Sequence, residues 1–247
     1  MTTPEFLAVL PVVFLAFVLK GLTGFGPGLL IVPVAAVLIG AQEAVLLIAF
    51  LDLVSNTLIA CKDRTSISPG FWIPIAIAMG AGSLIGGLFL KLVPPRDFSF
   101  LLAVVVALTG VWFLFGRISR QGKTLMAELP AKTRPKDTVV ALSTGIFGGF
   151  FGLTGILIAT YLGGFLTKEV LRRVLVRVLL VSATIRVITY TATGMYSLNI
   201  LLLAAGAIPL VLTGLYCGDR LLFRISELWF SRVIGAAMLI SAARMLL

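Results

Sequence analysis

The sequence contains no histidine, and its ten carboxylates are dispersed along the chain. A metal site with histidine ligands or a Ser/His/Asp triad therefore cannot be built, which excludes hydrolytic chemistry of that type. Cysteine is also scarce: Cys61 and Cys217 lie within or at the end of apolar stretches and show no CxxC spacing, so we expect unreactive thiols. These absences predict a protein without a metal, a cofactor or an enzymatic reaction.

Charged residues make up only 12% of the chain, whereas 60% of the residues are hydrophobic and the mean hydropathy is +1.13. No water-soluble domain of 247 residues stays folded and dispersed with such a composition, so the solvent is predicted to be lipid. The net charge of +10 does not indicate a nucleic-acid partner, because the lysines and arginines are scattered at the ends of apolar runs. Basic residues placed in this way are typical of signals that orient a protein in a membrane.

Apolar runs recur along the whole chain, separated by charged residues or by proline and glycine. Two of these runs, 28–40 and 155–167, give about 20 Å of helix each, which is less than the roughly 30 Å of the hydrocarbon core. We therefore predict an all-α polytopic membrane protein of eight to ten segments, in which the first two of each half are short, broken or re-entrant. The ten apolar runs are 5–22, 28–40, 41–61, 70–91, 98–117, 138–152, 155–167, 171–194, 198–218 and 228–247.

Several features recur in the same order in the two halves, at a nearly constant shift of 127 to 128 residues. This recurrence favours a duplication, with 1–117 as the first membrane repeat, 118–137 as a linker and 138–247 as the second repeat. Because each repeat holds five segments, the second enters the membrane in the opposite orientation. Inverted repeats are characteristic of secondary transporters that bind their solute near the midplane, between the repeats. The matched features are Gly24 with Gly152, Val54–Leu58 with Val181–Ile185, and Gly87 with Gly214.

The orientation follows from the positive-inside rule. The stretch Arg117–Lys136 carries six basic residues, which predicts a cytoplasmic linker and an N-terminus outside, in a multi-pass protein of the cell inner membrane. The opening residues lack a basic region and a small-residue cleavage site, so we expect no cleaved signal peptide. Small residues in the fourth, fifth and tenth segments are compatible with a homodimer and equally with packing inside one chain.

Two glycine-rich runs precede the two short segments and are expected to interrupt regular helix. In lipid, such backbone is tolerated only where protein or a watery cavity satisfies its N–H and C=O groups. A half-helix that starts there points unpaired N–H groups and a positive dipole end into the cavity, which favours an anion. The alternative is that these glycines only let helices pack closely. The candidate binding residues in the two runs are Gly24, Gly26, Pro27, Gly28, Gly152, Thr154 and Gly155.

Uncharged polar side chains in the third and eighth segments are further candidates for solute binding. Ser55 and Asn56 belong to the third segment, and Ser182 and Thr184 to the eighth. Side chains of this kind can line a binding site, but they also hold helices together by hydrogen bonds worth about 0.6 to 2 kcal/mol each. Both interpretations stay open at the level of sequence.

Three ionisable residues lie in or beside apolar runs, where a charge near the bilayer centre costs about 2.5 to 3.5 kcal/mol. Arg186 is interpreted as a cation that attracts the substrate, and Asp52 as a carboxylate that couples transport to protons; the alternative for both is an ion pair. Lys20 ends the first segment beside a glycine run, so it is either a site cation or a cytoplasmic anchor, and the anchor interpretation is favoured.

At the glycine runs the chain resembles the sulfite exporter TauE/SafE family, whose halves each open with a helix, a glycine-rich FG-x-GGG-like run and an apolar stretch that often carries proline. Gly24–Gly28, continued to Pro33, is similar to the first copy. Phe151–Gly155 is similar to a degraded second copy, in which Thr154 and Ile156 replace glycines. The family's polar patch, basic loop and following helix correspond loosely to Asp52–Asn56, Lys62–Arg64 and Gly70–Trp72.

The resemblance implies transport of sulfite, organosulfonates or other small organic anions, driven by an ion gradient of H⁺ or Na⁺. Our working hypothesis is a secondary transporter that binds a small anion at the two glycine breaks and alternates access by rocking its repeats. The competing hypothesis is a non-transporting membrane scaffold, an assembly factor or a lipid-handling protein, in which the glycines merely pack helices. A membrane-embedded enzyme is disfavoured, because no cluster of histidine, cysteine or carboxylates is present.

Overall fold

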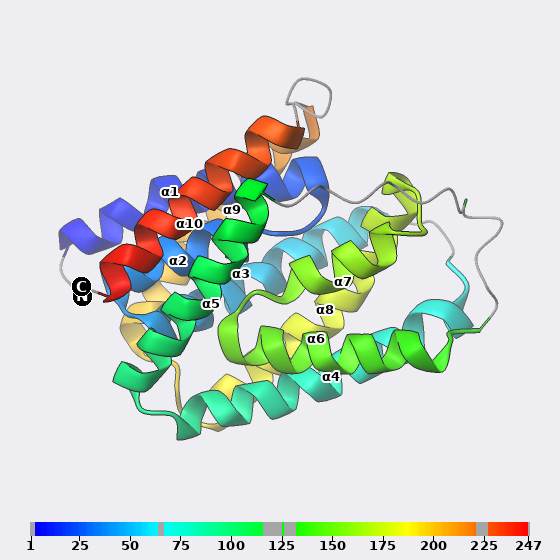
Figure 1. Cartoon of the computed structure of the whole chain (residues 1–247), viewed down its shortest axis with the longest axis horizontal. Coiled ribbons are helices and arrows are strands. Elements are labelled where there is room, and N and C mark those ends of the chain that lie inside the picture. The colour runs from blue at the N-terminus through cyan, green and yellow to red at the C-terminus, as the bar shows by residue number, and fades with distance from the viewer. Residues whose placement is uncertain (1–2, 64–66, 116–124, 126–131, 221–226, 247) are drawn as a thin grey trace.

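The computed structural model describes residues 3–63, 67–115, 125, 132–220 and 227–246. Within these residues the chain forms ten α-helices and no strand, which confirms the all-α prediction (Figure 1). The basic residues Arg117, Arg120 and Lys123 of the predicted linker lie outside the described residues. The helices are α1 (Thr3–Thr23), α2 (Gly28–Ile39), α3 (Ala41–Lys62), α4 (Pro69–Leu92), α5 (Pro95–Phe115), α6 (Pro135–Phe151), α7 (Thr154–Gly163), α8 (Lys168–Ala192), α9 (Leu198–Arg220) and α10 (Glu227–Leu246).

In the part of the chain that the structure describes, five helices, α3, α4, α5, α8 and α9, are long and apolar enough to cross a membrane. The helices α2 and α7 have 12 and 10 residues, and at 1.5 Å per residue neither reaches across the hydrocarbon core. Their shortness was predicted. The first helix of each half is longer than its partner: α1 has 21 residues and α6 has 17, so the interruption falls after a long helix.

Three helices begin before the start of their predicted apolar runs. Each of them begins at a proline: Pro69 in α4, Pro95 in α5 and Pro135 in α6. Proline suits the first helical position, since its fixed φ is already helical and its missing N–H would have no partner there. At α6 the backbone N–H of Arg134 donates to Oδ2 of Asp137 at 2.9 Å. Hydropathy alone could not locate these starts, because the first turns of α5 and α6 carry charged residues.

The helices pack into two groups, and α3 of one group packs against α8 of the other. One apolar cluster is built mainly from α1, α2, α3, α5, α9 and α10, and the other from α4, α6, α7 and α8. Within the groups, α1 packs against α9, α5 against α10, and α4 against both α6 and α8. In Figure 1, α4 and α6 run along one side of the molecule, and α1, α9 and α10 lie at the other.

Glycines bring α4 and α6 into backbone contact. A Cβ added at Gly82 would lie 2.2 Å from the carbonyl oxygen of Leu142, and one added at Gly86 would lie 2.2 Å from that of Ile146. Close approach through small residues is a common way for membrane helices to associate. The helix-packing interpretation of glycine is therefore correct for these positions, which lie outside the two glycine-rich runs.

The two glycine-rich runs interrupt the helices, as predicted. Between α1 and α2 the backbone passes through positive φ at Gly24 (83°) and Gly26 (88°), and between α6 and α7 it does so at Gly152 (76°). Residues with a Cβ rarely adopt this conformation, so glycine is needed at these turns. Each break is followed directly by one of the short helices, which places the start of α2 and the start of α7 inside the bundle.

Candidate functional site

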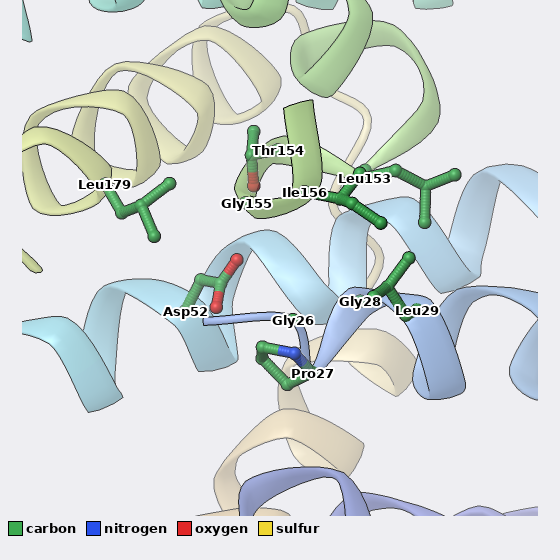
Figure 2. A pocket seen from close by; sticks show the side chains of 11 residues that line it. Gly26, Pro27, Gly28, Leu29, Asp52, Leu153, Thr154, Gly155, Ile156 and Leu179 are labelled. Carbon is green, nitrogen blue, oxygen red and sulfur yellow. The ribbon is translucent and has the colours of Figure 1, made fainter. Parts of the chain in front are cut away.

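A small cavity lies between the starts of α2 and α7 (Figure 2). The volume of this cavity that is open to a water-sized sphere is about 10 Å³, which is room for about one water molecule. The cavity is thus too small for sulfite in this conformation. Its walls come from both interrupted regions and from α3 and α8: Gly26, Pro27, Gly28, Leu29, Asp52, Gly152, Leu153, Thr154, Gly155, Ile156 and Leu179.

The two breaks touch each other through their glycines. A Cβ added at Gly28 would lie 2.7 Å from the carbonyl oxygen of Gly152. A Cβ added at Gly155 would lie 3.3 Å from the backbone N of Gly26. Any side chain at either position would push the two backbone segments apart. The structure therefore brings together six of the seven candidate residues of the glycine runs; Gly24 lies beside the stem of Arg172 instead.

The starts of the two short helices differ in how many backbone donors they leave open. No side chain caps the first turn of either helix. In α2, the N–H groups of Leu29 and Leu30 donate to the carbonyls of Gly26 and Pro27 at 3.1 and 3.2 Å. In α7, the N–H groups of Thr154, Gly155, Ile156 and Leu157 make no backbone hydrogen bond to residues that precede the helix in the described part of the chain. The start of α7 is therefore the better donor surface, and it carries the positive end of the helix dipole.

Three buried ionisable side chains form one cluster beside this cavity. Asp52 on α3 accepts from Lys20 Nζ on α1 at 2.8 Å and from Arg186 Nη2 on α8 at 3.1 Å. Lys20 also donates to Ser55 Oγ at 2.7 Å. Lys20 and Arg186 are 0% exposed and Asp52 is 5% exposed. The interpretation of Lys20 as a cytoplasmic anchor is wrong, because its ammonium group points into the protein, where Asp52 and Ser55 replace its water.

The cluster contains two basic side chains and one carboxylate. Two cations share the single carboxylate of Asp52, and the Nε and Nη1 atoms of Arg186 are buried without a hydrogen-bond partner in the described part of the chain. A buried donor left unpaired costs about 1 to 3 kcal/mol, and more when it is charged. A buried cation whose counter-charge is shared with another cation is costlier still. The arrangement is therefore suited to receive an additional anion or polar group at Arg186.

Of the polar and charged candidates of the third and eighth segments, Asp52 lines the cavity, whereas Ser55, Asn56, Ser182, Thr184 and Arg186 do not. Ser182 shares a hydrogen bond with Ser83 Oγ on α4 at 2.7 Å, which links α4 to α8. Thr184 donates back to the carbonyl of Leu180 in its own helix at 2.8 Å. Asn56 is fully buried, one helical turn from Asp52, and neither its Nδ2 nor its Oδ1 has a partner among the described residues.

The sequence interpretation missed several residues around the site. Leu179 lines the cavity; it precedes Arg186 by seven residues, so two helical turns place both on one face of α8. Tyr190, one turn after Arg186, is buried and donates to the carbonyl of Gly149 at 2.6 Å. The helical spacing from Arg186 was the available signal for both. Tyr196, which donates to the carbonyl of Leu46 at 3.1 Å, follows α8 and carried no such signal.

Comparison with known protein families identifies the family to which the sequence is similar. A family model described as "Sulfite exporter TauE/SafE" matches residues 9–245, which is nearly the whole chain. No curated protein and no solved structure matches the sequence.

Proposed function

Because the chain belongs to the sulfite exporter TauE/SafE family, a family of membrane transporters rather than enzymes, we propose that it moves one small anion across the membrane by alternating access. Sulfite, an organosulfonate or a small organic acid is the substrate class. The protein is a multi-pass membrane protein with five long apolar helices, and its cargo in the family is a sulfur-containing anion. The geometry of the cavity and of the neighbouring charge cluster supports binding of the anion between the two interrupted helices.

The observation that carries this proposal is the guanidinium of Arg186, which is paired at only one of its three nitrogens. It is 0% exposed, its Nε and Nη1 atoms have no partner among the described residues, and the Asp52 carboxylate that Nη2 contacts lines the cavity. An oxyanion bound there takes the open donors of Arg186, the first-turn N–H groups of α7 and the hydroxyl of Thr154, which points toward Asp52 in Figure 2. Charge-assisted bonds of this kind are about twice as strong as neutral ones.

The scaffold hypothesis explains the glycines of the α4–α6 contact but not the glycines at the two helix breaks. A scaffold needs glycines that let helices approach, as at Gly82 and Gly86. The scaffold hypothesis does not explain why helices end inside the bundle, nor why a buried cation keeps donors without partners. A helix end buried without partners is unfavourable unless a ligand or water satisfies it. The combination of the breaks with Arg186 therefore favours a transporter.

The packing of the helices supports a repeat with alternating access. α1 packs on α9 as α6 packs on α4. A Cβ at Gly82 would meet the carbonyl oxygen of Leu142 at 2.2 Å, and one at Gly214 would meet that of Phe14 at 2.8 Å. Gly87 instead faces Thr189 on α8, so Gly82 rather than Gly87 is the counterpart of Gly214. Rocking of the two repeats around the cavity would open it to either side.

We propose 1–117 and 138–247 as the two repeats, in opposite orientations, with the linker 118–137 in the cytoplasm. A reporter that is active only in the cytoplasm, fused at Lys123, tests the orientation. Activity is expected there, and activity only for a periplasmic reporter at the same site would overturn the topology.

Counterflow in proteoliposomes tests the function. Vesicles that contain the purified protein are loaded with unlabelled sulfite and diluted into a trace of labelled sulfite, with sulfoacetate and acetate as competing anions and choline as a competing cation. Transient accumulation of label, inhibited by anions and not by choline, is expected. A folded protein that gives no counterflow with sulfite or sulfoacetate would contradict the proposal and favour the scaffold hypothesis.

A further inference from the structure

Asp52 differs from the other carboxylates of the described chain in its position. It lines the cavity and at the same time contacts both buried cations, Lys20 and Arg186. The other carboxylates of neighbouring elements are elsewhere: Asp63 lies near Arg177 at 3.8 Å, and Asp219 pairs with Arg172. The cavity thus has one acidic group, placed where it competes with a bound anion for the same donors.

The charged side chains that face Asp52 come from two neighbouring helices. From α1 comes the ammonium of Lys20, and from α8 the guanidinium of Arg186. The start of α2 and the start of α7 contribute backbone and the hydroxyl of Thr154 but no charged side chain. On α9 the charged residues are Asp219 and Arg220 at its final turn, and on α5 they are at its exposed start.

The charge balance of the site depends on the state of Asp52. With Asp52 ionised and both Lys20 and Arg186 protonated, the three side chains carry one net positive charge, which matches a monovalent anion. An anion that reaches the open donors of Arg186 lies within a few Å of the Asp52 carboxylate, and two negative groups so close disfavour each other's ionised form. A divalent anion leaves the site negative unless Asp52 is neutral, and an uncompensated charge in this buried place is costly.

We propose that Asp52 takes up one proton when the anion binds and gives it up when the anion leaves, so that the protein moves one proton together with each anion. This inference rests on the proposed function and deepens it. The proton enters from the aqueous side that supplies the anion and adds to a carboxylate oxygen of Asp52; no other bond forms or breaks. The neutral acid then leaves Arg186 to the anion, while Lys20 keeps Ser55 as a partner. By linkage, protonation of Asp52 raises the affinity for the anion by the same factor as the anion favours protonation.

The test compares exchange with net, gradient-driven uptake of labelled sulfite in proteoliposomes. Counterflow needs no net proton movement, whereas accumulation against a concentration gradient does. With an external medium one pH unit more acidic than the lumen and the membrane potential held at zero, one proton per anion predicts about tenfold accumulation by the wild type. Asp52→Asn cannot take up the proton, so its counterflow is slowed but measurable and its gradient-driven accumulation is lost. Asp52→Glu still carries a titratable carboxyl group, so it is expected to keep gradient-driven accumulation, with a shifted pH dependence.

The variants are needed because a proton can also travel on sulfite itself as bisulfite. If Asp52→Asn accumulates sulfite as the wild type does, the transported proton is not carried by Asp52 and the inference is overturned. Robust wild-type counterflow without any response to the pH gradient, or a response to Na⁺ instead, overturns it as well and leaves the proposed function standing. Absence of wild-type counterflow contradicts the proposed function itself.

If Asp52→Asn does not fold, Asp52→Glu tests whether Asp52 carries the proton. Its carboxyl group lies on a longer stem and so meets the two cations at different distances. The pH at which gradient-driven accumulation reaches half its maximum is therefore expected to move by several tenths of a unit or more. An unchanged pH profile together with normal counterflow would identify Asp52 as a structural counter-ion and reject the coupling role.

Discussion

Arg186 and Asp52 form an ion pair across 134 positions of sequence, with Nη2 and Oδ2 separated by 3.1 Å. Asp52 belongs to α3 in the first half of the chain, and Arg186 to α8 in the second. The pair therefore joins the two halves at the place where the interrupted helices meet. If the repeats rock against each other during transport, the strength of this contact changes as the cavity opens. Substrate charge and conformational change are then linked through the same two side chains.

The hydroxyl of Thr154 distinguishes anion binding from simple packing. Thr154→Val keeps a methyl group against Gly148, the neighbour of the present methyl, but removes the donor. Sulfite affinity, measured from the concentration that half-saturates thermal stabilisation, is expected to fall about two- to tenfold, the equivalent of one hydrogen bond. Thr154→Ser retains the hydroxyl and is expected to keep most of the affinity. Equal affinity in the wild type and Thr154→Val would remove this residue from the site.

The contact between α4 and α6 is predicted to depend on Gly86 and to tolerate change at Gly80. A Cβ at Gly86 would lie 2.2 Å from the carbonyl oxygen of Ile146, whereas one at Gly80 would lie 3.4 Å from side-chain atoms of Val181 and Ile185. Overpacking against backbone costs typically about 1 to 3 kcal/mol. Thermal unfolding in detergent should therefore show a clear loss for Gly86→Ala and little change for Gly80→Ala. Similar effects of the two substitutions would argue against close backbone packing.

The second helix break gives a separate prediction about backbone conformation. Gly152→Ala and Gly194→Ala both place a Cβ on backbone with positive φ, which costs about 1 to 2 kcal/mol. At Gly152 the Cβ would also lie 3.1 Å from Val32, whereas at Gly194 nothing lies within 4 Å. Both variants should be destabilised in thermal unfolding, Gly152→Ala more strongly, and only Gly152→Ala should weaken stabilisation by sulfite. A loss of sulfite response in Gly194→Ala would show that the break is not specifically involved.

Asn56 and Ser182 are predicted to separate the roles of site lining and helix contact. The buried amide of Asn56 has no partner among the described residues, so Asn56→Leu should leave the unfolding temperature unchanged or raise it. We propose that this amide is used during transport, so counterflow should nevertheless slow. Ser182→Ala loses the hydrogen bond to Ser83 and should lower the unfolding temperature while counterflow persists. The reverse pattern would exchange the two assignments.

Much of the fold was predictable because lipid imposes simple conditions on the chain. A long apolar run has to form a helix there, and a glycine-rich run has to break one, so composition predicted the start of α2 at Gly28 and placed the start of α7 at Gly155, next to its observed start at Thr154. The breaks also placed six of the candidate residues around one cavity. The starts of α5 and α6 were less predictable, since their first turns are charged.

The direction of individual side chains could not be predicted. Lys20 ends an apolar run, and an interfacial lysine and a buried one have the same sequence signature; only the position of Asp52 on another helix decides between them. Ser182 was a candidate for the site because it is polar, but which face of α8 meets α4 depends on tertiary packing, and that face carries Ser182 to Ser83. The open donors of Arg186 likewise depend on three helices that meet in space.

Calorimetric titration of sulfite into the purified wild type and Arg186→Gln tests the central claim most directly. The substitution leaves Asp52 paired with Lys20, so the cluster stays balanced while its excess positive charge is removed. The wild type is expected to bind sulfite, Arg186→Gln to bind at least about tenfold more weakly, and Arg186→Lys, which keeps the charge but not the planar fork, to fall between them. Equal affinity in all three proteins would contradict a binding site centred on Arg186.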